Sequence, residues 1–115
     1  MKATTRCLRE LTRTAKNLRE IKKSDLRFGD LVIVTTRNSN YNLHVLGNGT
    51  YLVSGGWFAK NGRSPTRMGV VGCTWGGSII KVDALAACGL RMEFANGVVT
   101  SPVREVRVVQ GQTQN

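Results

Sequence analysis

Residues 72–78 read GCTWGGS, a glycine-rich run that is superficially similar to a phosphate-binding loop. Such a loop cradles phosphates with backbone amides, carries a lysine that reaches the terminal phosphate, and opens a helix. Here Ser78 stands where the lysine is required, Lys81 follows later, and residues 79–82 (IIKV) are typical of a strand. The segment therefore predicts a tight turn between two strands, with Trp75 packed over it, and no nucleotide site.

His44 is the one histidine and thus the only usual base for nucleophilic catalysis. It lies between Leu43 and Val45 in a segment typical of a strand, where a structural imidazole is the more common role. The sequence has no Gly-x-Ser-x-Gly motif, and its 7 acids form no close or helix-spaced pair. We therefore predict no catalytic residues and a protein that is not an enzyme.

The cysteines Cys7, Cys73 and Cys88 are odd in number and lack the spacing of metal ligands. With a single histidine to join them, they predict free thiols in a reducing cytoplasm, no metal site and no cofactor. No apolar run reaches the roughly 18 residues of a spanning helix, and the N-terminus lacks the apolar core of a signal peptide. We expect a cytoplasmic protein with no membrane partner.

Residues 55–69 (GGWFAKNGRSPTRMG) combine adjacent aromatic residues with several cations and contain no acid. Bases stacked on aromatic faces, with cations on the phosphates, are how single-stranded nucleic acid is bound without sequence readout. The stretch predicts a long basic loop, and its candidate nucleic-acid-binding residues are Trp57, Phe58, Lys60, Arg63 and Arg67. The alternative interpretation places both rings in the core and leaves the cations as a solubilising surface.

Apolar residues recur at helical spacing between about residues 5 and 23. They are Leu8, Leu11, Ala15, Leu18 and Ile21. The opposite side of the expected helix gathers the cations Arg6, Arg9, Arg13, Lys16 and Lys23. The pattern predicts a basic amphipathic helix whose charged side could contact a polyanion. Alternatively, the charged side is only solvated, or the apolar side docks into an acidic protein partner or a second copy of the chain.

From residue 26 onward the apolar period becomes two, and Gly, Asn and Ser interrupt the chain at short intervals, which is typical of a small sandwich or barrel. Strands are expected at residues 31–36, 41–46, 50–54, 68–74, 78–82, 91–94, 98–100 and 103–109. Asn96-Gly97 is the dipeptide preferred in type I′ turns, and Gly47-Asn48-Gly49 predicts a short hairpin loop. Asp83 is expected to cap a helical turn over residues 84–88.

The 115-residue chain has 17 Lys and Arg against 7 Asp and Glu, a net charge of +10, and is 41% hydrophobic. This composition excludes a collagen-like or disordered chain and fits one compact domain. The expected fold class is mainly β (α+β), a barrel or sandwich of about six to eight short antiparallel strands. We expect a helix over residues 1–25, the β domain over 26–109 and a disordered tail over 110–115.

Within the β domain, residues 36–41 (TRNSNY), 76–78 (GGS) and 100–103 (TSPV) stand out as short motifs. In these motifs the chain resembles a small bacterial family of β-rich proteins for which no activity is established. The resemblance implies a compact β fold and supplies no mechanism. It covers about residues 30–108, so the expected N-terminal helix lies outside it.

Charge placement favours a small, non-enzymatic, nucleic-acid-associated binding protein. The alternative is a protein-interaction or regulatory adaptor module that docks through its N-terminal helix and could self-associate as a homo-oligomer. A third option is a small-molecule binder at the barrel mouth, with the Gly-Gly-Ser turn as one wall.

Overall fold

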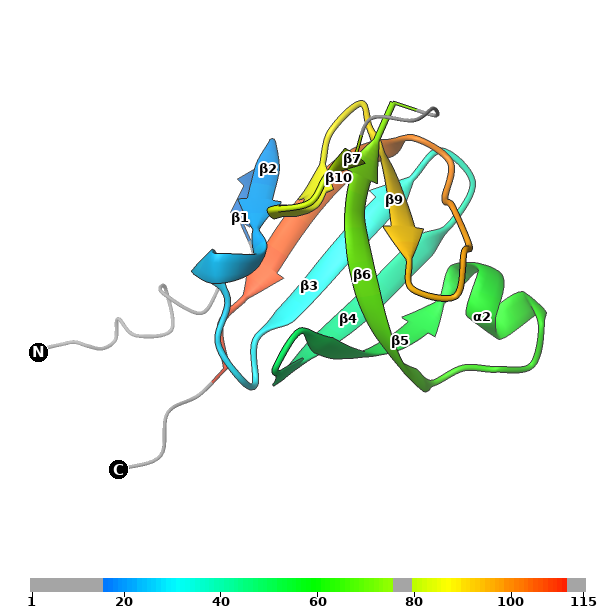
Figure 1. Cartoon of the computed structure of the whole chain (residues 1–115), viewed down its shortest axis with the longest axis horizontal. Coiled ribbons are helices and arrows are strands. Elements are labelled where there is room, and N and C mark those ends of the chain that lie inside the picture. The colour runs from blue at the N-terminus through cyan, green and yellow to red at the C-terminus, as the bar shows by residue number, and fades with distance from the viewer. Residues whose placement is uncertain (1–15, 76–79, 112–115) are drawn as a thin grey trace, which may run out of the picture.

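The computed structural model describes residues 16–75 and 80–111 (Figure 1). Its strands are β1 (Lys16–Leu18), β2 (Glu20–Lys22), β3 (Leu31–Thr36), β4 (Asn40–Gly47), β5 (Thr50–Gly55), β6 (Thr66–Thr74), β7 (Ile80–Lys81), β8 (Ala84–Ala87), β9 (Arg91–Phe94) and β10 (Val103–Val109). Among these residues there is one α-helix, α2 (Gly56–Lys60), and one short 3-10 helix, η1 (Lys23–Asp25). None of the described helices is long and apolar enough to cross a membrane.

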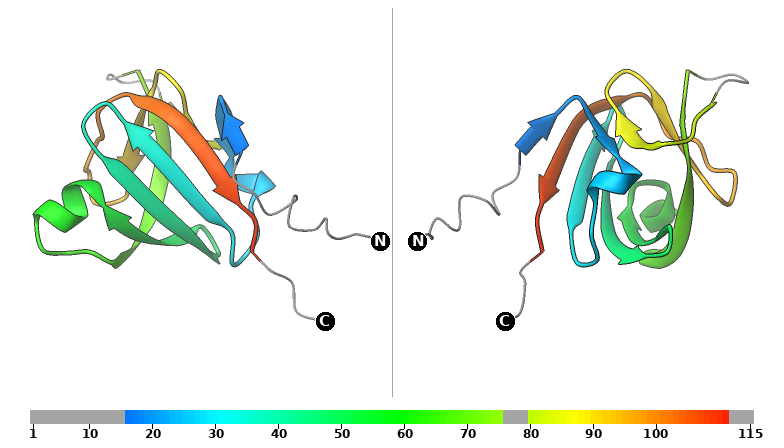
Figure 2. Two further views of the ribbon diagram at one scale, coloured as in Figure 1. Left: turned by 180° about the vertical axis from the view of Figure 1, so that it is seen from behind. Right: turned by 60° about the vertical axis from the view of Figure 1, so that its left-hand side comes forward.

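The strands form two antiparallel sheets. The larger has eight strands in the order β1-β10-β3-β4-β5-β6-β7, with β9 also paired to β6. Figure 2 shows that this sheet curls into a half-barrel. The smaller sheet pairs β2 with β8. The mainly β fold class is thus confirmed.

The burial of successive side chains alternates along the strands, so the large sheet has a core side and an outer side. In β3, Val32 and Val34 are fully buried, whereas Leu31 and Ile33, which alternate with them, are only half-buried. Because directly paired residues share a side of the sheet, the register places Val106 beside Val34 on the core side. The expected strands at residues 31–36, 41–46, 50–54, 68–74, 91–94 and 103–109 are confirmed, and 78–82 is confirmed at residues 80–81.

Aromatic rings fill the part of the core beneath α2. The Phe58 ring lies edge-on to Phe94, with 4.9 Å between centroids, and edge-on to Tyr41 at 6.3 Å. All three side chains are buried. Edge-to-face pairs of this kind add about 0.5–1.5 kcal/mol each to the burial of the rings, so this cluster ties α2 firmly to the sheet.

The helix expected over residues 5–23 is wrong for its described part, because residues 16–22 form β1 and β2. Ile21 pairs with Ala86 and is buried, and Leu18 pairs with Val106 and packs against the core. Pairing with strands distant in the sequence overrides the local helical pattern here. The β domain therefore begins before residue 26, and residues 1–15, with the rest of the expected helix, lie outside the described part.

Three other local expectations are also corrected. The helical turn expected at residues 84–88 is β8, whose four residues are all buried because β2 pairs along it. The long loop expected at residues 55–69 contains α2 and the first residues of β6. The strand expected at residues 98–100 is reduced to a single bridge between Glu93 and Val99.

The type I′ turn lies in the hairpin between β4 and β5, and not at Asn96-Gly97 where it was expected. Asn48 and Gly49 have φ of +55° and +74°, as both central residues of that turn require. At Asn96-Gly97 only Gly97 has positive φ, and its amide donates to the Phe94 carbonyl at 2.9 Å. This contact is the i to i+3 bond of a type I turn followed by a left-handed glycine.

Gly111, which lies in the tail expected to be disordered, is held in place by a hydrogen bond. The Gly111 amide donates to the Asp30 carboxylate at 2.9 Å. Residues 112–115 lie outside the described part.

Candidate nucleic-acid interface

Two glycines set the position of α2 at the end of β5. Gly55 has φ of +89° and Gly56 φ of +50°, values that other residues rarely adopt. A Cβ at Gly55 would meet the Asn40 carbonyl, and one at Gly56 would lie on the Tyr41 ring. The Tyr41 hydroxyl in turn accepts a hydrogen bond from the Trp57 amide at 3.1 Å. The start of α2 is therefore fixed against β4.

The two adjacent aromatic residues of α2 have different environments. Phe58 is fully buried, so its ring cannot stack on a ligand, and its assignment as a stacking residue is corrected. Trp57 is only partly buried, edge-on to Phe58 at 5.3 Å between centroids. The Arg63 guanidinium carbon lies 6.0 Å from the centre of the Trp57 ring, within the range of a cation–π contact.

The segment between α2 and β6 is held by hydrogen bonds in spite of its exposure. The Arg63 amide donates to the Phe58 carbonyl at 2.7 Å, and the Asn61 side chain donates to the Trp57 carbonyl at 2.7 Å. The Ser64 hydroxyl accepts from the Gly55 amide at 3.2 Å, which attaches the segment to the end of β5. The exposed side chain of Arg63 thus projects from an ordered backbone.

Arg67 extends this cationic region onto the outer side of the sheet. It is exposed on β6 and begins a row of directly paired residues that crosses the sheet. The row continues through Leu52 of β5 and His44 of β4 to Leu31 of β3. His44 is therefore an exposed residue in the middle of an outer row, and the structural imidazole expected there is not found. None of its partners in this row is an acid, so nothing in the row orients it as a catalytic base.

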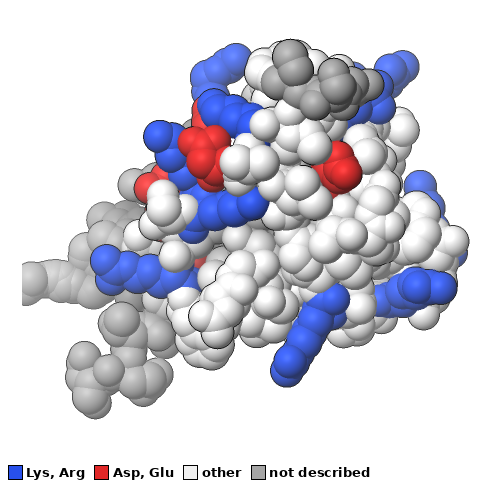
Figure 3. Space-filling model, in the orientation of Figure 1, with Lys and Arg blue, Asp and Glu red and all other residues white. Residues whose placement is uncertain are grey.

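We define the basic face as Trp57, Lys60, Arg63 and Arg67. From residue 31 to residue 82 the sequence contains no acid, so no carboxylate from these elements offsets the face. In Figure 3 the lower right part of the molecule, over α2 and the segment that leads to β6, carries blue side chains and no red ones. This long acid-free stretch, which extends well beyond residues 55–69, is the sequence signal that marks the whole region.

Arg37 is an exposed cation that the site prediction missed. It lies in the turn between β3 and β4, and its amide donates to the Pro102 carbonyl at 2.9 Å. This turn stands at the same end of the sheet as α2, because Asn40 of β4 borders Gly55. Its place in a polar turn within the acid-free stretch is the sequence signal that could have identified Arg37 as a candidate.

The TRNS and TSPV motifs meet in this turn. The Ser101 hydroxyl donates to the Thr36 hydroxyl at 2.9 Å and accepts from the Asn38 amide at 3.0 Å. The Thr36 hydroxyl donates to the Ser39 carbonyl at 2.9 Å. We call these contacts the hydroxyl clasp. It joins the β3–β4 turn to the segment before β10, which gives both motifs a structural role.

The remaining predicted cations do not join the basic face within the described residues. Lys23 lies in η1, and its ammonium group donates to the Val71 carbonyl at 3.0 Å. Lys16 lies in β1, on the opposite edge of the sheet from β6. Arg6, Arg9 and Arg13 lie outside the described part.

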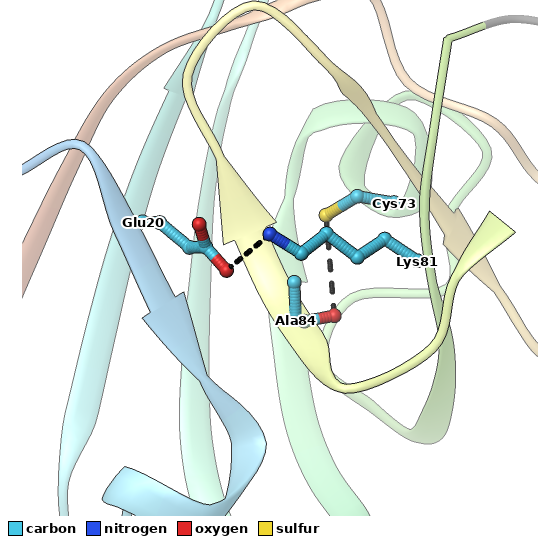
Figure 4. A network of polar contacts seen from close by, with 4 residues as sticks. All are labelled: Glu20, Cys73, Lys81 and Ala84. Carbon is cyan, nitrogen blue, oxygen red and sulfur yellow. Dashed lines mark hydrogen bonds and ion pairs between the residues drawn. The ribbon is translucent and has the colours of Figure 1, made fainter.

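A polar network between β2, β6, β7 and β8 is structural (Figure 4). The Lys81 ammonium group lies 2.8 Å from Glu20, an ion pair that joins β7 to β2, and this hydrogen bond raises the pKa of Lys81. Beside it, burial raises the pKa of the Cys73 thiol to about 11. Cys73 and Cys88 are free thiols, and no cluster of metal-binding side chains occurs among the described residues.

Comparisons with family models, curated proteins and solved structures found no match to this chain. The basic face itself is therefore the feature that bears on function.

Proposed function

We propose that this protein is a small non-enzymatic binder of single-stranded nucleic acid, and that the basic face is its contact surface. One observation carries the proposal: an ordered, acid-free surface that presents Lys60, Arg63 and Arg67 beside the partly exposed Trp57 ring. Cations supply the sequence-independent part of nucleic-acid affinity through the phosphates. An aromatic ring with a guanidinium group beside it offers flat surfaces on which an unpaired base stacks.

The order of the backbone supports binding by this surface. Side chains that project from a hydrogen-bonded segment lose less freedom when they meet a ligand than side chains on an unstructured loop. The contacts of Ser64 with Gly55 and of Arg63 with Phe58 hold the segment between α2 and β6. This order supports the proposal, because the cations on the segment would need little rearrangement to contact a phosphate chain.

The adaptor hypothesis has less support. It needs Leu18 and Ile21 on the free apolar face of a helix, but both pack against the core of the protein's own β domain. A ligand inside the curl is also less favoured, because Phe58, Met92 and Phe94 fill that side of the sheet.

Fluorescence anisotropy with a labelled single-stranded oligonucleotide of about 10 nucleotides tests the proposal, since binding sites on small β domains span about 4–16 nucleotides. We expect the triple variant K60E/R63E/R67E to lose most of the affinity at physiological salt. The matched control R19E/R91E/R104E reverses three other exposed arginines, around Cys88 and β9, and lowers the net charge by the same amount. It should retain most of the binding.

Equal loss in both triple variants would mean that only the overall charge matters and would contradict a defined contact surface. A wild-type protein that does not bind the strand at physiological salt would overturn the proposed function.

A further inference from the structure

Phe28 is the most exposed large apolar side chain of the described residues, with 75% of its surface accessible. It lies in the turn between η1 and β3. A phenylalanine ring left in water gives up most of the stabilisation that its burial would bring. The fold therefore gains little from an aromatic residue at this position.

The turn that carries Phe28 is tightly held. The Asp30 carboxylate accepts from the Arg27 amide and the Gly111 amide, both at 2.9 Å. The Gly29 amide donates to the Val45 carbonyl at 2.9 Å, and the Val45 amide donates to the Asp30 carbonyl at 2.9 Å. These bonds attach the turn to β4 and to the end of the chain, so the exposed ring is presented by a fixed backbone.

An open cleft of about 290 Å³ lies beside the Phe28 ring. Its lining residues are Phe28, Leu46, Gly47, Asn48, Thr50 and Arg67. The volume falls just below the range of roughly 300–1,000 Å³ of pockets for drug-sized ligands, so the cleft suits a single small ring system. An aromatic surface, the Asn48 amide, the Thr50 hydroxyl and the Arg67 guanidinium group together match the groups of one nucleotide.

The cleft adjoins the basic face through Arg67. Thr50 pairs with Gly69 and Leu52 with Arg67, so the β5–β6 ladder runs from the cleft toward α2. Gly55, at the other end of β5, contacts Ser64 beside Arg63. A single-stranded nucleic acid whose phosphates contact these cations along the ladder would bring its following bases to the cleft.

We propose that the cleft is a nucleobase subsite, in which one unpaired base of a single-stranded nucleic acid stacks on Phe28 while Arg67 holds the adjoining phosphate. This inference rests on the proposed function and extends it, because it assigns base contact to a residue outside the basic face. The polar edge of the base would lie toward Asn48 and Thr50, which line the cleft and carry hydrogen-bonding side chains.

The test compares Phe28→Ala with Phe28→Tyr, using an oligothymidylate strand and an abasic strand of the same length. Removing an aromatic stacking partner costs about 1–3 kcal/mol per base, so Phe28→Ala should weaken oligothymidylate binding about 5- to 150-fold. Affinity for the abasic strand should not change, because that strand has no base to stack. Phe28→Tyr keeps the ring and should bind like the wild type.

Val99→Ala is the control for the loss of an exposed apolar side chain elsewhere, since Val99 is 45% exposed and lies beyond β9. It should leave both affinities unchanged. Because the Phe28 ring is so exposed, its removal should not unfold the protein, which thermal denaturation checks.

If K60E/R63E/R67E loses binding but Phe28→Ala keeps wild-type affinity for oligothymidylate, the subsite is wrong and the basic face stands. Equal weakening of the oligothymidylate and abasic strands by Phe28→Ala would also overturn the stacking role. Failure of the wild type to bind oligothymidylate would overturn both proposals.

Discussion

At the scale of single residues, Cys73 shows how burial changes chemical behaviour. Its side chain is fully buried, and its thiol lies 3.9 Å from the Ala84 carbonyl (Figure 4). Desolvation is the main reason that its pKa is raised to about 11, from an ordinary value near 9. At neutral pH the thiol is therefore protonated, which makes it a poor nucleophile.

This shift predicts a dependence of stability on alkaline pH. Because the folded protein holds the thiol proton more tightly than the unfolded chain, the contribution is complete below pH 9 and is lost as the pH rises toward 11. Between pH 8 and pH 10.5 the free energy of unfolding of the wild type should fall by about 2 kcal/mol more than that of Cys73→Ala. Urea titrations at both pH values measure the difference. Parallel pH profiles of the two proteins would contradict it.

At the scale of elements, the hydroxyl clasp decides how the β3–β4 turn meets the segment before β10. Ser101 provides two of its hydrogen bonds, to Thr36 and from Asn38. The turn also carries Arg37, so the clasp sets the position of an exposed cation near α2.

Ser101→Ala should destabilise the protein by about 1–3 kcal/mol, because two hydrogen bonds are lost at about 0.5–1.5 kcal/mol each. The matched control is Asn38→Ala, since Asn38 takes part through its backbone amide and its side chain is exposed. The control should stay within about 0.5 kcal/mol of the wild type. Chemical denaturation of both variants and of the wild type measures these differences. If Ser101→Ala were as stable as the wild type, the Ser101 hydroxyl would contribute nothing to stability.

At the scale of the whole molecule, the structure includes β1 and β2 in the β domain. Ile21 packs into the core, Glu20 pairs with Lys81, and Lys23 bonds to the Val71 carbonyl. Residues 16–25, the described part of the expected helix, therefore belong to the β domain, and β2 covers β8.

A chain that begins at residue 26 should be less stable than the full chain by at least about 3 kcal/mol, because it loses the buried Ile21 side chain and the partner strand of β8. The point variant Ile21→Ala isolates the first contribution and should cost about 2–4 kcal/mol. Guanidinium unfolding of the three proteins provides the comparison. Unfolding of the shortened chain at the same denaturant concentration as the full chain would show that β1 and β2 are dispensable.

The sequence is sufficient to predict the strands whose side chains alternate, such as residues 31–36 and 103–109, because a period of two specifies a half-buried strand wherever it lies. It also determined the cationic character of residues 55–69, since charge depends on composition alone. The sequence left the environment of Phe58, in the same stretch, open between a stacking surface and the core. Adjacent aromatic residues look equivalent in a sequence, and only packing against Tyr41 and Phe94 buries one and leaves the other partly exposed.

The tertiary structure alone decided features that depend on partners far apart in the chain. β2 and β8 have weak local strand patterns and become strands because each supplies the other's hydrogen bonds across more than 60 residues. The hydroxyl clasp joins residues 36 and 101, and the cleft beside Phe28 forms where three separate segments meet. Local propensity cannot encode such contacts, because their free energy arises only when the sheet brings the segments together.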